Sequence, residues 1–364
     1  MCSLREVRLS ELKEISSFFS ETGGERMKAA VIEAIGQPLV VKEVPTPEPG
    51  PGEILVKIEA SGVCNGDIDA HAGDFPTPAL PQLPRIPGHR GAGTVEAVGA
   101  DVTRVAVGDR VGVPLVHRSC GHCEYCFNGQ HMLCSAVVLT GFQVDGGYAQ
   151  YVKADADYIG RIPDGLSIEQ AAHLTCTGVT AWGALKAAEL EAGQWCAVFG
   201  LGAVGQYTVQ YAKAFGLRVV AVSAHDEALA IARSNGAEVT VNSRVDDPPK
   251  YIRKQIGGVH AAICNSIKVE PFVQCFHALR RKGTLVAIGL PVADLPIPIF
   301  SLIMKEITVR GSFVGSRNDL EAAYHTAARL GIRLDTEEAP LDAVNAVFQR
   351  IRAGTTSSRI LLRP

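Results

Sequence analysis

The stretch from about residue 174 to residue 311 alternates short apolar runs with helical patterns, and this alternation limits the possible folds of the chain more than any other feature. The apolar runs have the length of strands: WCAVFG, RVVAVS, AEVTVN, HAAIC, TLVAIG and ITVRG. Helical patterns such as AVGQYTVQYAKAFG, DEALAIARSNG and VEPFVQCFHALRRKG lie between most of them. Strands that alternate with helices form a parallel sheet covered on both faces. We therefore predict a doubly wound α/β domain over residues 174–311.

A glycine-rich turn, GLGAVG, follows the first of these strands and opens the first helix. In this setting the pattern G-x-G-x-x-G is typical of a Rossmann dinucleotide site, because the glycines allow a tight turn, close approach of a pyrophosphate and close helix–sheet packing. The helix N-terminus then receives the negative charge. A structural turn without a nucleotide is the alternative. The residues expected to contact the dinucleotide are Gly200, Gly202, Ala203, Val204 and Gly205.

The choice between NAD and NADP depends on the end of the second strand. An NAD site usually carries an acidic residue about twenty positions after the glycine turn, where it binds the adenosine ribose. Ser223 stands at that position; a serine does not repel a 2′-phosphate, and His225 could help to hold one. Asp226 and Glu227 argue for NAD, although acidic residues also suit the first turn of a helix. The pattern leaves both cofactors open and slightly favours NADP.

The remaining chain divides into three parts that differ in their residue patterns. Residues 27–173 contain short alternating runs such as EILVKIEA and GTVEAVG, separated by proline and glycine, which predicts a β-rich domain with long loops. The tail, residues 312–364, has helical stretches and a last short strand, RILLR, and we expect it to return to the β-rich domain. Residues 1–26 form a peripheral extension in which EISSFF is one weak helical turn or two. Met27 is a plausible alternative first residue.

Four cysteines lie within fifteen residues, in the run CGHCEYCFNGQHMLC. Four thiolates around one ion match a closed, tetrahedral, structural zinc site. An iron–sulfur cluster also takes four cysteines, but this spacing fits ferredoxin runs poorly. Four unrelated cysteines in one loop are the remaining alternative. The expected ligands of the structural zinc are Cys120, Cys123, Cys126 and Cys134.

Three isolated residues, Cys64, His89 and Cys176, could build a second, open zinc site. Two cysteines and one histidine with an exchangeable fourth position form a recognised catalytic arrangement. Spacing alone does not establish it, because each of these residue types is more often found in a core. The second zinc therefore depends on the three side chains meeting in the fold.

Composition excludes several classes of protein. The 364 residues are 47% hydrophobic and 20% charged with a net charge of −3, which offers no basic surface for nucleic acid or anionic membranes. The apolar stretches are too short and too broken by glycine to span a bilayer, and the N-terminus lacks the pattern of a secretory signal. Ten cysteines in a long chain favour metal binding in a reducing compartment over a disulfide scaffold. We expect a cytoplasmic protein.

Taken together, the motifs resemble the zinc-dependent medium-chain alcohol dehydrogenases, particularly the bacterial and yeast-type tetrameric branch. The resemblance covers about residues 27–364 and is carried by these motifs: GVC-x-x-D, PGHxGAG, the four-cysteine run, DGGYAQYV, CTGVTAWGAL, GLGAVG, GSFVGSR and SSRILL. It implies a GroES-like catalytic domain closed by the tail, a Rossmann domain, an active cleft between them, and a homotetramer or homodimer. It also implies two zinc ions per subunit and NAD or NADP.

The resemblance also implies roles for single residues. Cys64, His89 and Cys176 would hold the catalytic zinc, and Asp67 would orient His89 with help from Arg359. Further positions carried over are Thr180, Ile288 and Arg359 at the cofactor, and Gly66, Phe75 and Leu115 in the substrate pocket. Relatives of the yeast type have tryptophan where this chain has Phe75 and Leu115, so a substrate bulkier than ethanol is expected.

The residues after Cys64 depart from the family pattern, which has a histidine, then serine or threonine, and a second histidine that relays the alcohol proton. This chain has Asn65, Gly66 and Asp69 at those places. Asp69, His71 or solvent would have to accept the proton instead. Arg90 stands where the family has a glutamate near the metal, and its charge opposes a cation unless Asp67, Asp69 or a substrate anion pairs with it.

Three functions follow in order of preference. The first is a zinc- and nicotinamide-dependent oxidoreductase that interconverts a small-molecule alcohol with an aldehyde or ketone. The second is 1,4-reduction of an enal or enone by the same scaffold, because no hydroxyl stands beside the carbonyl oxygen. The third, of another class, is a nucleotide-binding protein without turnover. The intact set of open-site ligands argues against the third.

Overall fold

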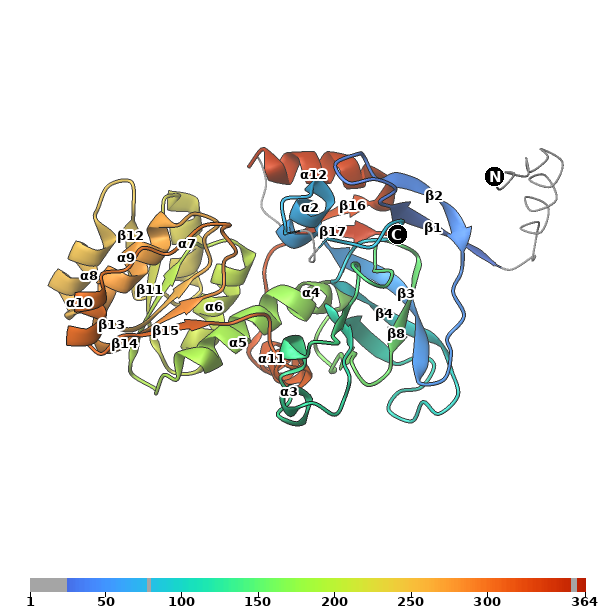
Figure 1. Ribbon diagram of the computed structural model, residues 1–364, viewed down its shortest axis with the longest axis horizontal. Helices are drawn as coiled ribbons and strands as arrows, with labels where there is room; N and C mark the ends of the chain where they lie inside the picture. The colour runs from blue at the N-terminus through green and yellow to red at the C-terminus, as the bar shows by residue number, and fades with distance from the viewer. Residues whose placement is uncertain (1–24, 77–79, 355–358) are drawn as a thin grey trace, which may run out of the picture.

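A computed structural model describes residues 25–76, 80–354 and 359–364. Two large sheets lie at opposite ends of the molecule, each with its own helices, and α4 (Ile168–His173) and α5 (Val179–Ala188) lie where the two halves meet (Figure 1). The predicted extension, including EISSFF, lies almost wholly outside the described residues. No helix within the described part has the length and apolar character needed to cross a bilayer.

The sheet at one end has six parallel strands in the order β12-β11-β10-β13-β14-β15. This is the doubly wound order, and it confirms the predicted Rossmann fold. The order reverses between β10 and β13, where a crevice opens at the carboxyl ends of the strands. The strands are β10 (Trp195–Phe199), β11 (Arg218–Ser223), β12 (Val239–Asn242), β13 (Val259–Cys264), β14 (Leu279–Ala287) and β15 (Thr308–Gly311).

Helices cover both faces of this sheet (Figure 1). Tyr207 and Val209 pack against one face, and Phe272 and Phe276 against the other, and all four are almost fully buried. Besides α5, the helices are α6 (Ala203–Ala214), α7 (Asp226–Ser234), α8 (Pro248–Ile256), α9 (Glu270–Ala278) and α10 (Ile299–Met304). The pattern that predicted α9 extends to Gly283, but the helix ends at Ala278. Leu279 instead begins β14, because it is buried and pairs with β13.

The second sheet forms the GroES-like half and has seven strands, in the order β16-β17-β3-β4-β5-β9 with β8 paired to β3. Its strands are β3 (Glu53–Gly62), β4 (Gly91–Val98), β5 (Arg110–Val113), β8 (Tyr151–Asp155), β9 (Gly160–Arg161), β16 (Glu337–Pro340) and β17 (Ile360–Arg363). The tail supplies the last two strands of this sheet (Figure 1): β17 pairs with β3 in antiparallel fashion, and β16 pairs with the other side of β17 in parallel fashion. Strand β16 was not expected from the sequence.

Further strands and helices complete this half. They are β1 (Arg26–Val31), β2 (Val40–Pro45), β6 (Val116–Arg118), β7 (Val138–Leu139), α2 (Asn65–Ala72), α3 (Glu124–Phe127), α11 (Arg317–Leu330) and α12 (Val344–Arg352), with 3₁₀ turns at His131–Leu133 and Leu341–Ala343. Helix α4 continues into a π-helical turn, Leu174–Gly178, before α5 begins. Such turns often occur at functional sites.

Candidate active site

The fold brings Cys64, His89 and Cys176 together, although they lie far apart in the sequence. Cys64 is the N-cap of α2, His89 precedes β4, and Cys176 lies in the π-helical turn. One ligand atom from each lies within 4.8 Å of the other two. Zinc binds sulfur at about 2.3 Å and nitrogen at about 2.0 Å. With bonds of these lengths, the ligand atoms of a tetrahedral zinc site also lie within 4.8 Å of one another. The donor set therefore fits a zinc ion with one open position.

Asp67 holds the imidazole of His89 through its Nδ1 atom. The side chain of Asp67 is 2% exposed, and His89 Nδ1 lies 2.7 Å from its Oδ1. Its other oxygen accepts hydrogen bonds from the Tyr148 hydroxyl at 2.8 Å and from the backbone N–H of Cys64 at 3.3 Å. Because Nδ1 of His89 is engaged, Nε2 is left for a metal. Sequence reasoning missed Tyr148, although its motif DGGYAQYV carried part of the resemblance.

The charges of the cluster are coupled. Burial alone would lower the pKa of His89, but the Asp67 carboxylate and the Cys64 sulfur raise it well above its usual range. A hydrogen bond from Cys176 holds the pKa of Cys64 well below its usual range, with the nearby Arg90 guanidinium contributing. The same bond, together with burial, raises the pKa of Cys176 to about 12. Of the two sulfurs, Cys64 is therefore the one that ionises more easily, and both would bind a metal as thiolates.

Arg90 is paired differently from the prediction. Its Nη2 donates to Cys64 Sγ at 2.7 Å and its Nη1 to the Val63 carbonyl at 3.1 Å, and within the described residues it makes no salt bridge with Asp67 or Asp69. The side chain is 2% exposed and crosses Gly62, where an added Cβ would lie 3.1 Å from Arg90 Cδ. The arginine therefore contacts one of the candidate metal ligands directly.

Gly66 lies beside two of the candidate metal ligands, Cys64 and His89. A Cβ built at Gly66 would lie 3.6 Å from Cys64 Sγ and 3.8 Å from His89 Cε1, which are ordinary contact distances. Asp69 is half-buried one turn further along α2, and burial raises its pKa, with Asp74 and Cys64 adding to the effect.

His71 is engaged elsewhere. Its Nε2 donates to the carbonyl of Gln37, and its ring packs edge-on against Phe348 with centroids 5.7 Å apart. His71 is therefore the one of the two proposed proton acceptors whose imidazole already has a hydrogen-bond partner.

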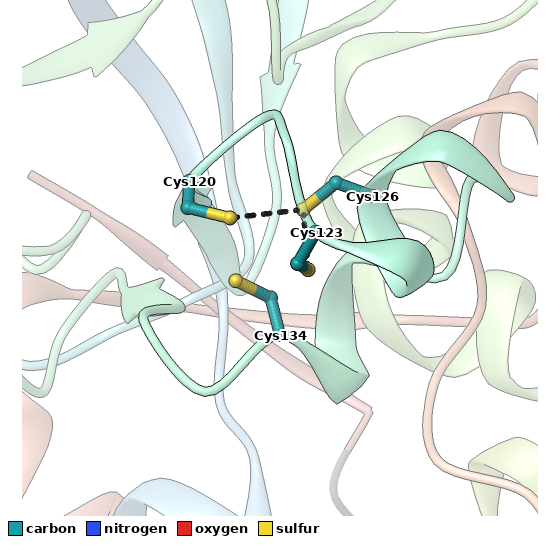
Figure 2. Close-up of side chains that lie close together, drawn as sticks. All are labelled: Cys120, Cys123, Cys126 and Cys134. Atoms are coloured by element: carbon teal, nitrogen blue, oxygen red, sulfur yellow. Dashed lines mark hydrogen bonds between the residues drawn. The ribbon is translucent and has the colours of Figure 1, made fainter.

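The four cysteines of the CGHCEYCFNGQHMLC run point their sulfur atoms toward one another (Figure 2). Cys126 Sγ lies 3.8 Å from Cys120 Sγ and 3.5 Å from Cys123 Sγ. A hydrogen bond from Ser119 at 3.1 Å lowers the pKa of Cys126 to about 6. All four sulfurs lie within 4.8 Å of one another, so the arrangement fits a metal site with no open position.

A groove at the carboxyl ends of β10, β11 and β12 fits a dinucleotide. Gly200 has φ of +86°, and a Cβ there would lie 3.1 Å from the backbone of Asn265. A Cβ on Gly205 would lie 2.0 Å from the Gly200 carbonyl, whereas Gly202 faces open space, where a pyrophosphate would lie. The lining includes Phe199, Gly200, Leu201, Gly202, Gln206, Ser223, Ala224, His225, Glu227, Ser243, Arg244, Ser266, Lys268, Glu270 and Arg359.

The other predicted cofactor residues lie around this groove. Ala203 and Val204 form the first turn of α6 and offer backbone N–H groups. Ser223 ends β11, and its Oγ accepts a hydrogen bond from the backbone N–H of His225 at 3.2 Å. Thr180 lies in α5 and Ile288 follows β14, and neither is among the groove-lining residues.

The predicted pocket residues Phe75 and Leu115 pack in one apolar cluster. Leu115 also lines a small pocket with Val179 and Val314.

His173 was also missed by sequence reasoning. It is fully buried three residues before Cys176, and neither ring nitrogen has a hydrogen-bond partner among the described residues. Burial, reinforced by Arg90 and Arg359, lowers its pKa to about 3. Nothing in the run HLTC distinguishes this imidazole from an ordinary core histidine, so the sequence carries no signal for it.

A GroES-like half, a Rossmann half, two clusters of metal-ligating side chains and a nucleotide groove define a zinc-binding dehydrogenase. Residues 50–164 match the family described as the alcohol dehydrogenase GroES-like domain, and residues 203–329 match the zinc-binding dehydrogenases. An alcohol dehydrogenase of Geobacillus stearothermophilus is 45% identical over 337 residues, which cover 93% of this chain and 99% of that protein. The chain therefore belongs to the zinc-dependent medium-chain alcohol dehydrogenases, a family of oxidoreductases.

Solved structures agree with this assignment. A zinc-binding dehydrogenase from Sinorhizobium meliloti 1021, bound to NADP, has a TM-score of 0.86 and 28% identity, with 93% of this chain and all of that chain covered. A thermostable alcohol dehydrogenase from Pyrobaculum aerophilum, bound to cobalt and zinc, has a TM-score of 0.83 at the same identity and coverage.

Proposed function

We propose that this enzyme interconverts a small-molecule alcohol with its aldehyde or ketone at the cluster of Cys64, His89 and Cys176. The observation that carries the proposal is the meeting of these three donors within 4.8 Å, next to a groove fit for a dinucleotide. A zinc ion held there would supply Lewis acidity toward the substrate oxygen, and the nicotinamide would carry the hydride. Asp67, 2.7 Å from Nδ1 of His89, would hold the imidazole in the tautomer that leaves Nε2 as the metal ligand.

The test is a panel of alcohols, aldehydes and ketones assayed with NAD(H) and NADP(H), followed by nicotinamide absorbance. Cys64→Ser should abolish turnover and leave dinucleotide binding intact, because it removes one ligand of the open site. Cys123→Ser is the matched control in the other cluster and should lower stability more than the chemistry itself. A wild type that binds the dinucleotide but turns over no member of the panel would instead support a nucleotide-binding protein without catalysis.

We further propose two zinc ions per chain, one in each cluster. The four cysteines Cys120, Cys123, Cys126 and Cys134 would hold the structural ion. Metal analysis of carefully prepared protein should find two equivalents of zinc. One equivalent or fewer would refute the second site.

The cofactor proposed is NADP in preference to NAD. Support comes from Ser223, which ends β11 where an NAD site usually has a carboxylate. Ser223→Asp should move the ratio of kcat/KM toward NAD, because the carboxylate would bind the ribose hydroxyls and repel a 2′-phosphate. An unchanged ratio would mean that the adenosine is recognised by other residues. Thr180, Ile288 and Arg359 are proposed to contact the cofactor, by resemblance to the family.

The substrate proposed is bulkier than ethanol. Gly66 has no side chain beside the ligands, and Phe75 and Leu115 stand where yeast-type relatives carry tryptophan. The proton of the alcohol would pass to Asp69, which burial makes a stronger base than an ordinary aspartate. Because Gly66 offers no hydroxyl to a carbonyl oxygen, reduction of an enal at its β-carbon is a second candidate reaction. Product analysis with cinnamaldehyde distinguishes the two, since it yields either the alcohol or the saturated aldehyde.

The chain is proposed to assemble as a homotetramer or homodimer. Strand β15 is an edge of the Rossmann sheet, and apolar side chains around it are exposed. They include Ile299, Phe300, Ile303 and Met304 of α10 and Val309 of β15. An uncovered edge strand beside apolar surface is a site for pairing with another chain, and a second copy is the occupant we propose.

The division into residues 27–173, 174–311 and 312–364 is proposed on the two sheets and on the pairing of β17 with β3. A cytoplasmic location is also proposed. Support comes from the cysteines of the described part, all of which are free thiols that could serve as metal ligands or pack in cores.

A further inference from the structure

The adenosine end of the nucleotide groove is built by two neighbouring strands. Ser223 at the end of β11 is in register with Asn242 at the end of β12, and the strands are parallel. The backbone N–H of Ser243 donates to the Ser223 carbonyl at 3.0 Å, so the two chains stay together past their last strand residues. Arg244 follows at once, and both Ser243 and Arg244 line the groove beside Ser223. Residues from β12 therefore reach the position that the second strand alone was expected to control.

The turn that presents Arg244 is held by Asn242. Its Oδ1 accepts a hydrogen bond from the backbone N–H of Arg244 at 2.9 Å, and its Nδ2 donates to Asp226 Oδ1 at 2.7 Å. The bond from Asn242 to Asp226 affects which residues can contact the cofactor. Asp226, one of the two acidic residues that argued for NAD, is turned toward Asn242 and is not among the residues lining the groove.

The guanidinium of Arg244 is free of competing partners in the part of the chain that the structure describes. Within the described residues it makes no salt bridge or side-chain hydrogen bond, unlike the paired Arg218 in the same sheet. A guanidinium binds phosphate oxygens in a bidentate manner and keeps its charge at any physiological pH. The hydroxyl of Ser223 accepts a hydrogen bond from the His225 N–H, and its own proton remains available for an acceptor. Glu227 is an opposing charge in the lining, and it lies on the first turn of α7.

We propose that Arg244 is the specificity-determining residue that binds the 2′-phosphate of NADP, with Ser223 and His225 adding hydrogen bonds from the end of the neighbouring strand β11 and the turn after it. The assignment rests on the dinucleotide-binding role proposed above for this groove. A general attraction of the groove for anions is the alternative. Lys268, on the turn after β13, supplies a second cation to the same lining, so its removal tests that alternative. Lys268 is therefore the matched control.

The experiment measures binding of 2′,5′-ADP, 5′-AMP, NADPH and NADH by calorimetry to the purified enzyme and to Arg244→Gln, Arg244→Lys and Lys268→Gln. Arg244→Gln should weaken 2′,5′-ADP and NADPH by ~10–100-fold, the range expected for lost charge-assisted hydrogen bonds. Binding of 5′-AMP and NADH should change less than about twofold, which also shows that the variant is folded. Arg244→Lys should retain part of the preference, and Lys268→Gln should leave the ratio of 2′,5′-ADP to 5′-AMP binding unchanged.

Two results would overturn the assignment: equal weakening of all four ligands by Arg244→Gln, or a preference for 2′,5′-ADP that this variant leaves intact. Because these measurements need no turnover, they are independent of the proposed reaction. An enzyme that oxidised no alcohol but lost 2′,5′-ADP binding in Arg244→Gln would support the assignment while refuting the proposed function. If the enzyme oxidised alcohols but Arg244→Gln kept the preference for 2′,5′-ADP over 5′-AMP, the proposed function would be supported and the assignment of Arg244 refuted.

Discussion

The guanidinium of Arg90 lies 2.7 Å from the sulfur of Cys64, inside a cluster of side chains fit for zinc. The contact places a fixed positive charge beside a residue that would also bind a divalent cation. Two consequences compete. The hydrogen bond keeps the sulfur in place, and the charge repels the ion. Coulomb repulsion between a unit charge and a divalent ion a few ångströms apart amounts to several kcal/mol even at an effective dielectric constant of about 20, so we expect repulsion to dominate.

Arg90→Gln should therefore retain zinc in the open site longer. Loss of zinc to a colorimetric chelator should slow by about tenfold or more, since ~1.4 kcal/mol already corresponds to that factor. Arg90→Lys keeps the charge and should behave like the wild type. The phase that belongs to the open site is identified by its absence in Cys64→Ser. Faster release from Arg90→Gln would show instead that the hydrogen bond to Cys64 dominates.

The contact of Asp67 with His89 should set zinc affinity at the open site. Asp67→Asn should lower that affinity by ~10–100-fold, the usual effect of losing a residue that orients a metal ligand. Tyr148→Phe removes a neutral donor to the same carboxylate and should have a smaller effect on zinc, with a loss of about 1–2 kcal/mol in the free energy of unfolding. Competitive titration and chemical denaturation measure the two quantities. Equal zinc affinity in all three proteins would remove Asp67 from this role.

The Asp69 carboxylate should lower the free energy of unfolding and also act as the general base in catalysis. Burial, Asp74 and Cys64 raise its pKa in the folded chain. A carboxyl of this kind destabilises the fold above its folded pKa, and the cost disappears as the pH falls to the unfolded value near 4. Asp69→Asn should thus raise the free energy of unfolding at pH 7 by less than ~1 kcal/mol, because the group is half exposed and screened, with a gain that shrinks toward pH 4.

The same variant should lower kcat for alcohol oxidation by ~10²-fold or more, the usual contribution of a positioned general base. Activity and denaturation are measured on one preparation across the pH range. Asp74→Asn is a control, since it relieves part of the same repulsion on the neighbouring turn without removing the carboxyl of Asp69. Full activity in Asp69→Asn would direct the proton to bulk solvent.

A hydroxyl at position 66 should speed carbonyl reduction. A Cβ there makes ordinary contacts with Cys64 and His89, so Gly66→Ser fits without displacing a ligand. We expect kcat to rise by up to ~10²-fold, and more when Asp69→His completes the relay, with non-additive effects because each group works through the other. Gly66→Ala adds the Cβ without the hydroxyl. If Gly66→Ala matches Gly66→Ser, or if neither raises kcat, the glycine serves as room for substrate.

The apolar surface on α10 should hold the assembly together. Phe300 and Ile303 are 76% and 65% exposed, and replacing both with glutamate should convert the oligomer to smaller species in light-scattering measurements. Val107→Glu, at a position 62% exposed in the GroES-like half, should leave the mass unchanged. A wild-type monomer, or an unchanged oligomer in the double variant, would refute this surface as the contact between copies.

Local periodicity was enough to predict the Rossmann half from sequence, because strands and helices there alternate and each has the apolar pattern of its own type. The same reasoning failed at Leu279 and at β16 (Glu337–Pro340), where pairing with a neighbouring strand outweighs local preference. Spacing identified the four candidate ligands of the cysteine run, since four thiolates grouped so closely suit a single metal ion. The roles of Cys64, His89 and Cys176 came from the resemblance to the family, because each of these residue types is more often found in a core.

Tertiary structure alone decided how these residues are supported. Arg90 meets Cys64 because β4 begins beside the end of β3, and Tyr148 reaches Asp67 from 81 residues away. Arg244 joins Ser223 only because parallel strands place their carboxyl ends at one edge of the sheet. Such contacts depend on which strands become neighbours, and the pairing is determined by packing of the whole chain. The sequence by itself therefore determined the kind of chemistry, and the fold determined the charges and hydrogen bonds that surround it.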